Sequence, residues 1–444
     1  MISRKEAMAA KRRRRQRHAR KMLLLAAAVF VAACAALWAA YEFGWFGEKD
    51  ASGNTAQKND GGGPSGDGAG EPAGESGGED TVGGEQAEES ADGGENAGGG
   101  RDEAGEGERP SGTTEPANAS RDTITFTFVG DVMMAGNVGR LVADKGYDYP
   151  FQHVADRLRA ADWTLANLET PISERGEPEQ KQYAYRTSPE ALPAIKDAGI
   201  DVVNLANNHV LDYGREAFLD TLDHLQSAEI GYVGAGRNEE EAYRPLFVET
   251  EGIRVAILGF SMVVPDVSWK AAGDQPGVAE TYDYTRPVEA IRKAAEEADL
   301  VVVMAHWGEE RNPHPVAKQT EMAHRYIDAG ADLVIGSHPH VLQGAEKYKD
   351  RWIFYSLGNF VFTTNEVKET WDTVILNATC TKDGACELAA EPVNNAWALP
   401  RPLEGAEAER VLSRLSEISI NARVEADGKI VALDHADPDG ITAP

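Results

Sequence analysis

Acidic, amide and imidazole side chains recur directly after short apolar runs in the middle of this sequence. The polar clusters that follow these runs are Asp131, Asn167 with Glu169, Asn207 to His209, His306, and His338 with His340. Carboxylate, amide and imidazole donors together suit a divalent transition metal such as Mn, Fe or Zn, whereas an all-oxygen set would favour Mg or Ca. The pattern therefore predicts a metal site that holds one or two ions.

The two histidines around Pro339 are the most informative pair. Residues two apart on a regular strand share a face, whereas on a loop after a strand they can reach two neighbouring ions. A carboxylate such as Glu169 can bridge two ions. In two-metal sites the ions lie roughly 3.5–4 Å apart and activate a water for in-line attack on phosphorus.

Each of these residues also has a purely structural interpretation when it is taken singly. Asp131 alone would be read as a helix cap, and Asn207 with Asn208 as a turn. Glu169 alone would be a solvated loop acid, and His306 a hydrogen-bonded core histidine. It is the combination, rather than any one residue, that indicates metal chemistry.

The elements that position these residues alternate between strands and helices. The pattern predicts strands at 124–129, 163–166, 202–205, 253–260, 300–304, 333–335, 352–356, 373–376 and near 387–393, and helices at 151–160, 189–198, 215–228, 286–298, 316–329 and near 409–418. Such alternation indicates an α/β fold with largely parallel core strands, and the strand-rich end suggests antiparallel additions. Ligands bind beyond the carboxyl ends of the strands in such sheets, so we expect the polar clusters to meet at one edge of a single sheet. The globular domain is predicted to span 121–400, with a C-terminal extension at 401–444.

The N-terminal part of the sequence has the pattern of a membrane anchor. Residues 1–21 are rich in Arg and Lys, and residues 22–42 form an apolar run that is free of charge before Glu42. About twenty apolar residues can cross a hydrocarbon core of roughly 30 Å. The positive side stays in the cytoplasm, so we expect a single-pass cell-membrane protein with its C-terminal domain outside. Two alternatives remain open: a cleaved signal peptide that releases a secreted protein, and lipoprotein processing at Cys34.

Residues 48–120 are dominated by Gly, Glu, Asp, Ser and Ala, and lack the apolar content for a core. We expect a disordered acidic linker that holds the domain off the membrane. The formal net charge of −29 also disfavours nonspecific binding of nucleic acid.

Cys380 and Cys386 flank a short loop at Lys382 to Gly384. If this is a hairpin loop with Gly384 left-handed, the two cysteines face each other across paired strands. An extracellular location would then permit a disulfide, and two free thiols are the alternative.

The motifs resemble the CapA family of bacterial capsule proteins, whose domain is similar to calcineurin-like metallophosphoesterases. The resemblance spans about 123–362. It is carried by Gly130-Asp131, Asn167-Leu168-Glu169, Asn207-Asn208-His209, His306-Trp307-Gly308, Ser337-His338-Pro339-His340 and Ser356-Leu357-Gly358-Asn359-Phe360. It implies a layered sandwich of the calcineurin-like metallophosphatase type.

The resemblance also implies roles for individual residues. Asp131 and His340 would bind the first metal, and Glu169 would bridge the two metals. Asn208, His306 and His338 would hold the second metal. His209 would lie beside the ions as a general acid or phosphate-orienting donor, and Asp212 would orient His209.

One position departs from the phosphoesterase pattern. These enzymes usually begin with Asp-x-His, whereas this chain has Asp131-Val132-Met133. The first metal site loses a strong ligand, which puts phosphodiester hydrolysis in doubt and leaves the case for one ion.

The resemblance implies a part in making, exporting or anchoring an anionic envelope polymer, poly-γ-glutamate. The hypotheses are a metal-dependent hydrolase acting on such a polymer, a non-enzymatic capsule assembly component that keeps the fold, and a secreted metallophosphoesterase. The implied partners are the polymer, the membrane through the N-terminal helix, and other capsule synthesis membrane proteins.

Overall fold

The computed structural model describes residues 122–362 and 367–433. The predictions for the basic segment, the anchor at 22–42 and the linker at 48–120 lie outside these residues. Among the helices that are described, none combines the length and the apolar character that a membrane span requires.

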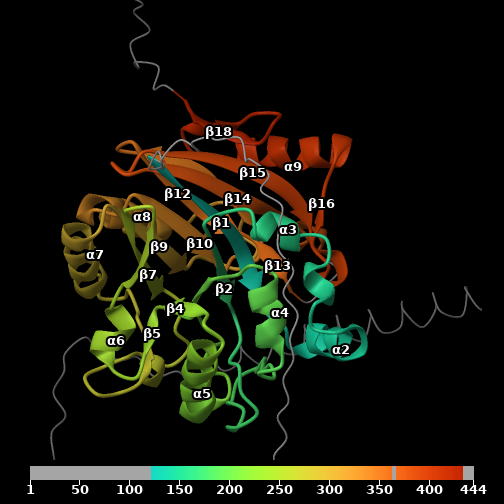
Figure 1. Cartoon of the computed structure of the whole chain (residues 1–444), viewed down its shortest axis with the longest axis vertical. Helices are drawn as coiled ribbons and strands as arrows, with labels where there is room; N and C mark the ends of the chain where they lie inside the picture. Colours follow the sequence, from blue (N-terminus) through green and yellow to red (C-terminus); the bar gives the residue numbers. More distant parts are fainter. Residues whose placement is uncertain (1–121, 363–366, 434–444) are drawn as a thin grey trace, which may run out of the picture. The chain divides into compact units, whose positions relative to one another are not determined.

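The larger sheet of the described part has a parallel half and an antiparallel half (Figure 1). The parallel strands are β1 (Thr123–Val132), β2 (Trp163–Leu168), β3 (Val202–Asn204), β4 (Gly231–Val233) and β13 (Asn359–Val361). The antiparallel strands are β14 (Asp372–Thr381), β15 (Cys386–Asn394), β16 (Arg401–Pro402), β17 (Ala422–Val424) and β18 (Lys429–Ala432).

A second sheet has parallel strands in its middle and antiparallel strands at both edges. The inner strands are β7 (Ile253–Ser261), β9 (Leu300–His306), β10 (Leu333–Ser337) and β12 (Arg351–Leu357), and the edges are β6 (Leu246–Thr250) and β11 (Leu342–Tyr348). A small antiparallel pair joins β5 (Ala235–Gly236) and β8 (Gly277–Val278). The predicted α/β fold with parallel core strands is confirmed.

The helices lie between the strands in sequence. They are α2 (Gly136–Lys145), α3 (Ala155–Leu158), α4 (Ala191–Asp197), α5 (Gly214–Ser227), α6 (Glu239–Tyr243), α7 (Thr285–Glu297), α8 (Ala317–Ala329) and α9 (Gly405–Glu417). Short 3₁₀ turns lie at Tyr149–Phe151, Val267–Trp269, Lys368–Thr370 and Ala396–Ala398.

Alternate side chains of the strands point to opposite sides and build three apolar layers. Phe128 of β1 and Val302 of β9 share the core between the two sheets. On the far side of the larger sheet Val203 packs in a cluster with residues of α4 and α5, and on the far side of the second sheet Val303 packs in a cluster with residues of α7 and α8. The order of layers is therefore helix, sheet, sheet, helix, with the main core between the sheets.

The expectation of a single sheet is wrong. The strands that precede the candidate residues divide between the two sheets: β1, β2 and β3 lie in the larger one, and β9 and β10 in the second. Periodicity identified each strand, but it carries no information about which strands pair.

The C-terminal segment continues the fold beyond residue 400. β16 and β18 both pair with β15, and Val411 and Leu415 of α9 are buried in the core between the sheets. The helix predicted near 409–418 begins four residues earlier, at Gly405.

The hairpin that joins β14 to β15 has the predicted geometry. Cys380 lies opposite Cys386 in the strand register, and the two form a disulfide. Gly384 has a φ of +86°, the left-handed conformation that glycine adopts most readily.

Candidate metal centre

The candidate ligands come from both sheets, at the carboxyl ends of their parallel strands. In the larger sheet Asp131 lies near the end of β1, Glu169 directly follows β2, and Asn208 lies shortly after β3. In the second sheet His306 is the last residue of β9 and His338 directly follows β10. Because the sheets pack face to face, these ends adjoin, and the predicted residues meet although their strands do not share one sheet.

A close approach of two strands fixes the position of Asp131. A Cβ added to Gly130 would lie 1.9 Å from the carbonyl oxygen of Gly358. The N–H of Asp131 donates to that same oxygen at 3.0 Å. Glycine at 130 is therefore required for β1 to pack against the segment that leads into β13.

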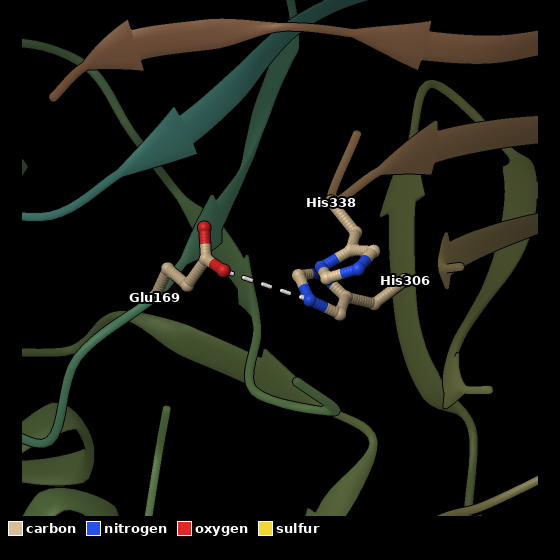
Figure 2. Close-up of side chains that lie close together, drawn as sticks. All are labelled: Glu169, His306 and His338. Carbon is tan, nitrogen blue, oxygen red and sulfur yellow. Dashed lines mark ion pairs between the residues drawn. The ribbon is translucent and has the colours of Figure 1, made fainter. Parts of the chain in front are cut away.

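Glu169, His306 and His338 converge from opposite sides (Figure 2). His306 Nε2 lies 3.6 Å from Glu169 Oε1, and the rings of His306 and His338 have centroids 4.7 Å apart. One donor atom from each of the three lies within 4.8 Å of the others. Glu169 and His306 are 0% exposed and His338 is 5% exposed, so this group is closed to bulk solvent.

Three atoms in this group have no hydrogen-bond partner among the described residues: Oε1 and Oε2 of Glu169 and Nδ1 of His338. A buried polar atom left unpaired costs about 1–3 kcal/mol, and it requires an explanation such as a bound ion. A carboxylate and imidazole nitrogens are the donors that a divalent transition metal prefers. The donor set therefore fits a metal ion.

The electrostatics of the group follow from its burial. Burial, and then the charge of Asp131, raise the pKa of Glu169 well above its usual range. Burial lowers the pKa of His338 to about 3 and that of His306 well below its ordinary value. Both imidazoles are thus neutral near pH 7, the form that coordinates metals.

A second set of donors adjoins the first and shares Glu169 with it. Donor atoms of Asp131, Glu169 and His340 also lie within 4.8 Å of one another. His340 Nδ1 is 3.1 Å from Asp131 Oδ2 and 2.9 Å from Asn359 Oδ1. Burial alone lowers the pKa of His340, but the carboxylates of Glu169 and Asp131 outweigh it and raise the pKa to about 9.

The backbone around Pro339 is unusual in conformation. His338 has a φ of +96° and His340 a φ of +58°, both in the left-handed region that side chains other than glycine rarely adopt. This turn places the two imidazole rings with centroids 5.8 Å apart. Such conformations cost about 1–3 kcal/mol each and cluster at functional sites.

Amide side chains hold the ligands in place. Asn208 Oδ1 lies 2.8 Å from His306 Nε2. Asn167 Nδ2 donates to Asp131 Oδ1 at 2.8 Å, and Asn167 Oδ1 accepts from Asn204 Nδ2 at 3.1 Å. The amides of Asn167 in β2 and Asn204 in β3 thus orient the carboxylate of Asp131 in β1.

His209 lies beside the metal-ligand candidates and is tied to Asp212. Its Nδ1 is 2.7 Å from Asp212 Oδ2. Lys181 Nζ donates to Asp212 Oδ1 at 2.6 Å and to the carbonyl oxygen of Asn208 at 2.8 Å. Burial lowers the pKa of His209, although the hydrogen bond to Asp212 opposes this shift.

Met133 is fully buried in an apolar cluster. It packs with Ala135 and Phe362, and the partly buried ring of Tyr185 lies against them. The ring of Phe362 has its centroid 4.7 Å from that of His340. Apolar side chains therefore occupy the position at which the phosphoesterase pattern has a metal ligand.

Several residues of the site were not assigned from the sequence. Asn359 belongs to the motif at 356–360, which indicated its importance but not its contact with His340. Ser337 Oγ lies 3.1 Å from His306 Nδ1 and stands beside the predicted His338. Lys181 reaches the site from a long irregular segment between β2 and α4, and no pattern in the sequence marks it.

Comparison with known proteins agrees with these motifs. The sequence profile of the family "Bacterial capsule synthesis protein PGA_cap" matches residues 125–364. Among solved structures, the Haemophilus influenzae NAD nucleotidase superposes with a TM-score of 0.38 and 12% identity, over 67% of this chain and 63% of that one.

Two curated proteins are similar to this chain over a longer stretch than the family profile. "Capsule biosynthesis protein CapA" of Bacillus anthracis is 36% identical over 307 residues, covering 67% of this chain and 74% of that protein. "PGA biosynthesis protein CapA" of Bacillus subtilis is 34% identical over 343 residues, covering 75% of this chain and 88% of that protein. With ligand candidates gathered at one buried centre and both comparisons in agreement, the chain belongs to the PGA_cap family of bacterial capsule synthesis proteins.

Proposed function

We propose that this protein acts in the synthesis, export or anchoring of a poly-γ-glutamate capsule through a metal-dependent, hydrolase-like centre. One observation carries the proposal: Glu169 and His338, which have unpaired buried donor atoms, lie together with buried His306 (Figure 2), and one possible ligand atom of each lies within 4.8 Å of the others. The names of the two Bacillus relatives support the capsule role. The helix–sheet–sheet–helix order, with donors at the strand ends, supports a calcineurin-like metallophosphatase architecture.

In this proposal Glu169, His306, His338 and Asn208 hold one ion, and Asp131 with His340 faces the neighbouring position. A bound ion supplies Lewis-acid polarisation of a carbonyl or phosphoryl oxygen and lowers the pKa of a bound water. The remaining polar groups of this chain then orient the substrate and move the proton.

His209 is the residue placed to move a proton. Its Nδ1 faces Asp212, which fixes the ring and leaves Nε2 as the nitrogen that can exchange a proton with a reacting group. Lys181 Nζ pairs with buried Asp212 at 2.6 Å and helps to hold the carboxylate in the position where it orients the ring. Asp212 and Lys181 act on the substrate only through His209.

The proposed setting is extracellular, with residues 22–42 as anchor and residues 48–120 as spacer. The disulfide between Cys380 and Cys386 supports this setting, because disulfides persist in oxidising compartments. The proposed partners are the anionic polymer, the membrane through the anchor, and other capsule synthesis membrane proteins.

Two substitutions test the metal-dependent role: His306→Ala and His338→Ala, each placed on the chromosome of the native host. We expect both to lower the metal content of the purified protein and the amount of capsular poly-γ-glutamate. His153→Ala, at an exposed position, is the matched control and should leave both unchanged. Polymer at the normal level in both variants would contradict a catalytic metal centre.

One observation favours a second candidate, a non-enzymatic assembly component that keeps the fold. Met133 puts an apolar side chain at the position where phosphoesterases have a ligand. For this candidate, deletion of the gene abolishes the polymer, whereas both histidine variants sustain it. The same strains therefore separate the two functions.

A further inference from the structure

We infer that the centre is mononuclear: one ion binds at Glu169, His306 and His338, and the side formed by Asp131 and His340 is closed by its own hydrogen bonds. This inference rests on the proposed function, because it assumes that the centre binds metal. It goes beyond the proposed function by stating how many ions the centre binds and which residues bind the ion.

The first observation is where the unpaired atoms lie. In the part of the chain that the structure describes, the buried side-chain nitrogen and oxygen atoms without a partner are Glu169 Oε1, Glu169 Oε2 and His338 Nδ1. Glu169 belongs both to the group with His306 and His338 and to the group with Asp131 and His340, whereas His338 belongs to the first group alone. An ion beside His338 would therefore pair unpaired atoms of two residues, and an ion beside His340 those of Glu169 alone.

The second observation is that Asp131 and His340 are already hydrogen-bonded to each other and to neighbouring amides. His340 Nδ1 has two oxygen partners, Asp131 Oδ2 at 3.1 Å and Asn359 Oδ1 at 2.9 Å. The other carboxylate oxygen of Asp131 accepts from Asn167 at 2.8 Å. An ion entering here would have to break these contacts, whereas an ion beside His338 would pair atoms that have no partner.

The third observation is the wall beside His340. Met133, Ala135 and Phe362 form an apolar cluster, and the Phe362 ring packs on His340 at 4.7 Å between centroids. A thioether is a soft ligand that suits Cu(I) rather than Mn or Zn. Among the described residues, this cluster offers no strong metal donor at the position of the missing histidine.

A mononuclear centre narrows the range of reactions that the site can catalyse. The two-ion clamp that stabilises both the attacking and the leaving oxygen of an in-line displacement at phosphorus is not formed. One ion can polarise a single carbonyl oxygen, such as that of an amide or a carboxylate in the polymer. The inference therefore favours a carboxyl- or amide-bearing substrate over a phosphodiester.

The test is the ratio of metal to protein in the full-length chain, purified without chelator and saturated with Mn²⁺ before desalting. Elemental analysis should give one ion per chain, and electron paramagnetic resonance should show an uncoupled Mn²⁺ signal. His340→Ala should keep one ion, His338→Ala should lose it, and the exposed control His153→Ala should keep it. Met133→His should raise the ratio towards two.

The outcomes distinguish two failures. Two ions per chain, a spin-coupled Mn²⁺ pair, or loss of the ion in His340→Ala would overturn the mononuclear inference and leave the metal-dependent function standing. No bound metal in the wild-type protein would overturn the proposed function itself. If Met133→His fails to fold, His340→Ala and the spectrum of the wild-type protein still decide the question.

Discussion

At the scale of single residues, Glu169 works against the stability of the fold. Its carboxylate is fully buried with both oxygens unpaired. We expect Glu169→Met to raise the free energy of unfolding of the metal-free protein by about 1–3 kcal/mol, since it removes an unsatisfied buried polar group. Urea denaturation in the presence of EDTA measures this change.

The matched control is Glu417→Met, at an exposed position of α9. It should change the unfolding free energy by less than about 0.5 kcal/mol. If Glu169→Met destabilised the metal-free protein, the unpaired oxygens would have partners in solution, and the argument for an ion would lose its main support.

The pH dependence of metal binding is a second prediction at this scale. Metal requires the ionised form of Glu169, whose pKa is raised well above its usual range by burial and then by Asp131. Protons therefore compete with the metal, and affinity should rise with pH well beyond the usual carboxyl pKa of about 4.3. The same shift makes metal-free protein less stable as pH rises through the raised pKa, because the fold must then bury a charge.

Competition with a chelating dye between about pH 5 and 9 measures this profile. His338 should contribute no step near the ordinary histidine pKa of about 6.5, because burial lowers its pKa to about 3. Affinity that is constant across this range would contradict the prediction.

The candidate ligands could be proposed from their residue types and their positions at or after strand ends, whereas the residues that contact and support them could not. Asp131, Glu169, Asn208, His306, His338 and His340 all stand at ends of strands, where their types are informative, and the structure gathers them at one centre. Asn359 and Lys181 act through contacts across 19 and 31 residues of sequence. Local pattern carries no signal for such long-range pairing.

At the scale of elements, the packing of β1 against the segment before β13 is the contact that leaves the least room for a larger side chain. We expect Gly130→Ala to lower the free energy of unfolding by about 1–3 kcal/mol, as overpacking does, because the added Cβ would meet the Gly358 carbonyl at 1.9 Å. The displaced strand would also carry Asp131 away from His340. Denaturation and the hydrogen-exchange rate of the Asp131 amide both measure the effect.

Gly139→Ala in α2 is the control for this substitution. A Cβ there would come no nearer than 3.3 Å to a heavy atom beyond the local helix backbone. Its effect should be small, or stabilising by about 0.5–1 kcal/mol, because alanine favours helices over glycine. Equal losses in both variants would show that the contact with Gly358 is not the cause.

Long periodic elements were predicted well and irregular ones were not. The strands β7, β9 and β10 and the helices α5, α7 and α8 lie at the predicted places. The helix predicted at 151–160 is instead a 3₁₀ turn at Tyr149–Phe151 and the short α3. The helix α2 was missed because Gly136 and Gly139 weaken its pattern.

At the scale of the whole molecule, the candidate ligands join two sheets across the core. The single-sheet expectation failed here, because carboxyl ends of two facing sheets give the same local sequence signal as those of one sheet. A bound ion would therefore crosslink the two halves of the domain and stabilise the fold as a whole, beyond its local effect on the loops.

This crosslink predicts a thermal shift. Metal at about 100 times its Kd stabilises by about 2.7 kcal/mol, so removal of metal by EDTA should lower the Tm by about 5–11 °C, given about 2–4 °C for each kcal/mol. Differential scanning calorimetry measures the shift. His338→Ala should show no response to EDTA, and an equal response in both proteins would show that the chelator acts elsewhere.

The left-handed backbone at His338 and His340 affects which substitutions these two positions can accept. Glycine would occupy both positions with less conformational strain, yet both carry a large aromatic heterocycle. A randomised library screened only for resistance to heat should enrich glycine or asparagine at these positions, whereas a library screened for capsule formation should retain histidine. The difference between the two enriched pools would measure how strongly function outweighs folding at this turn.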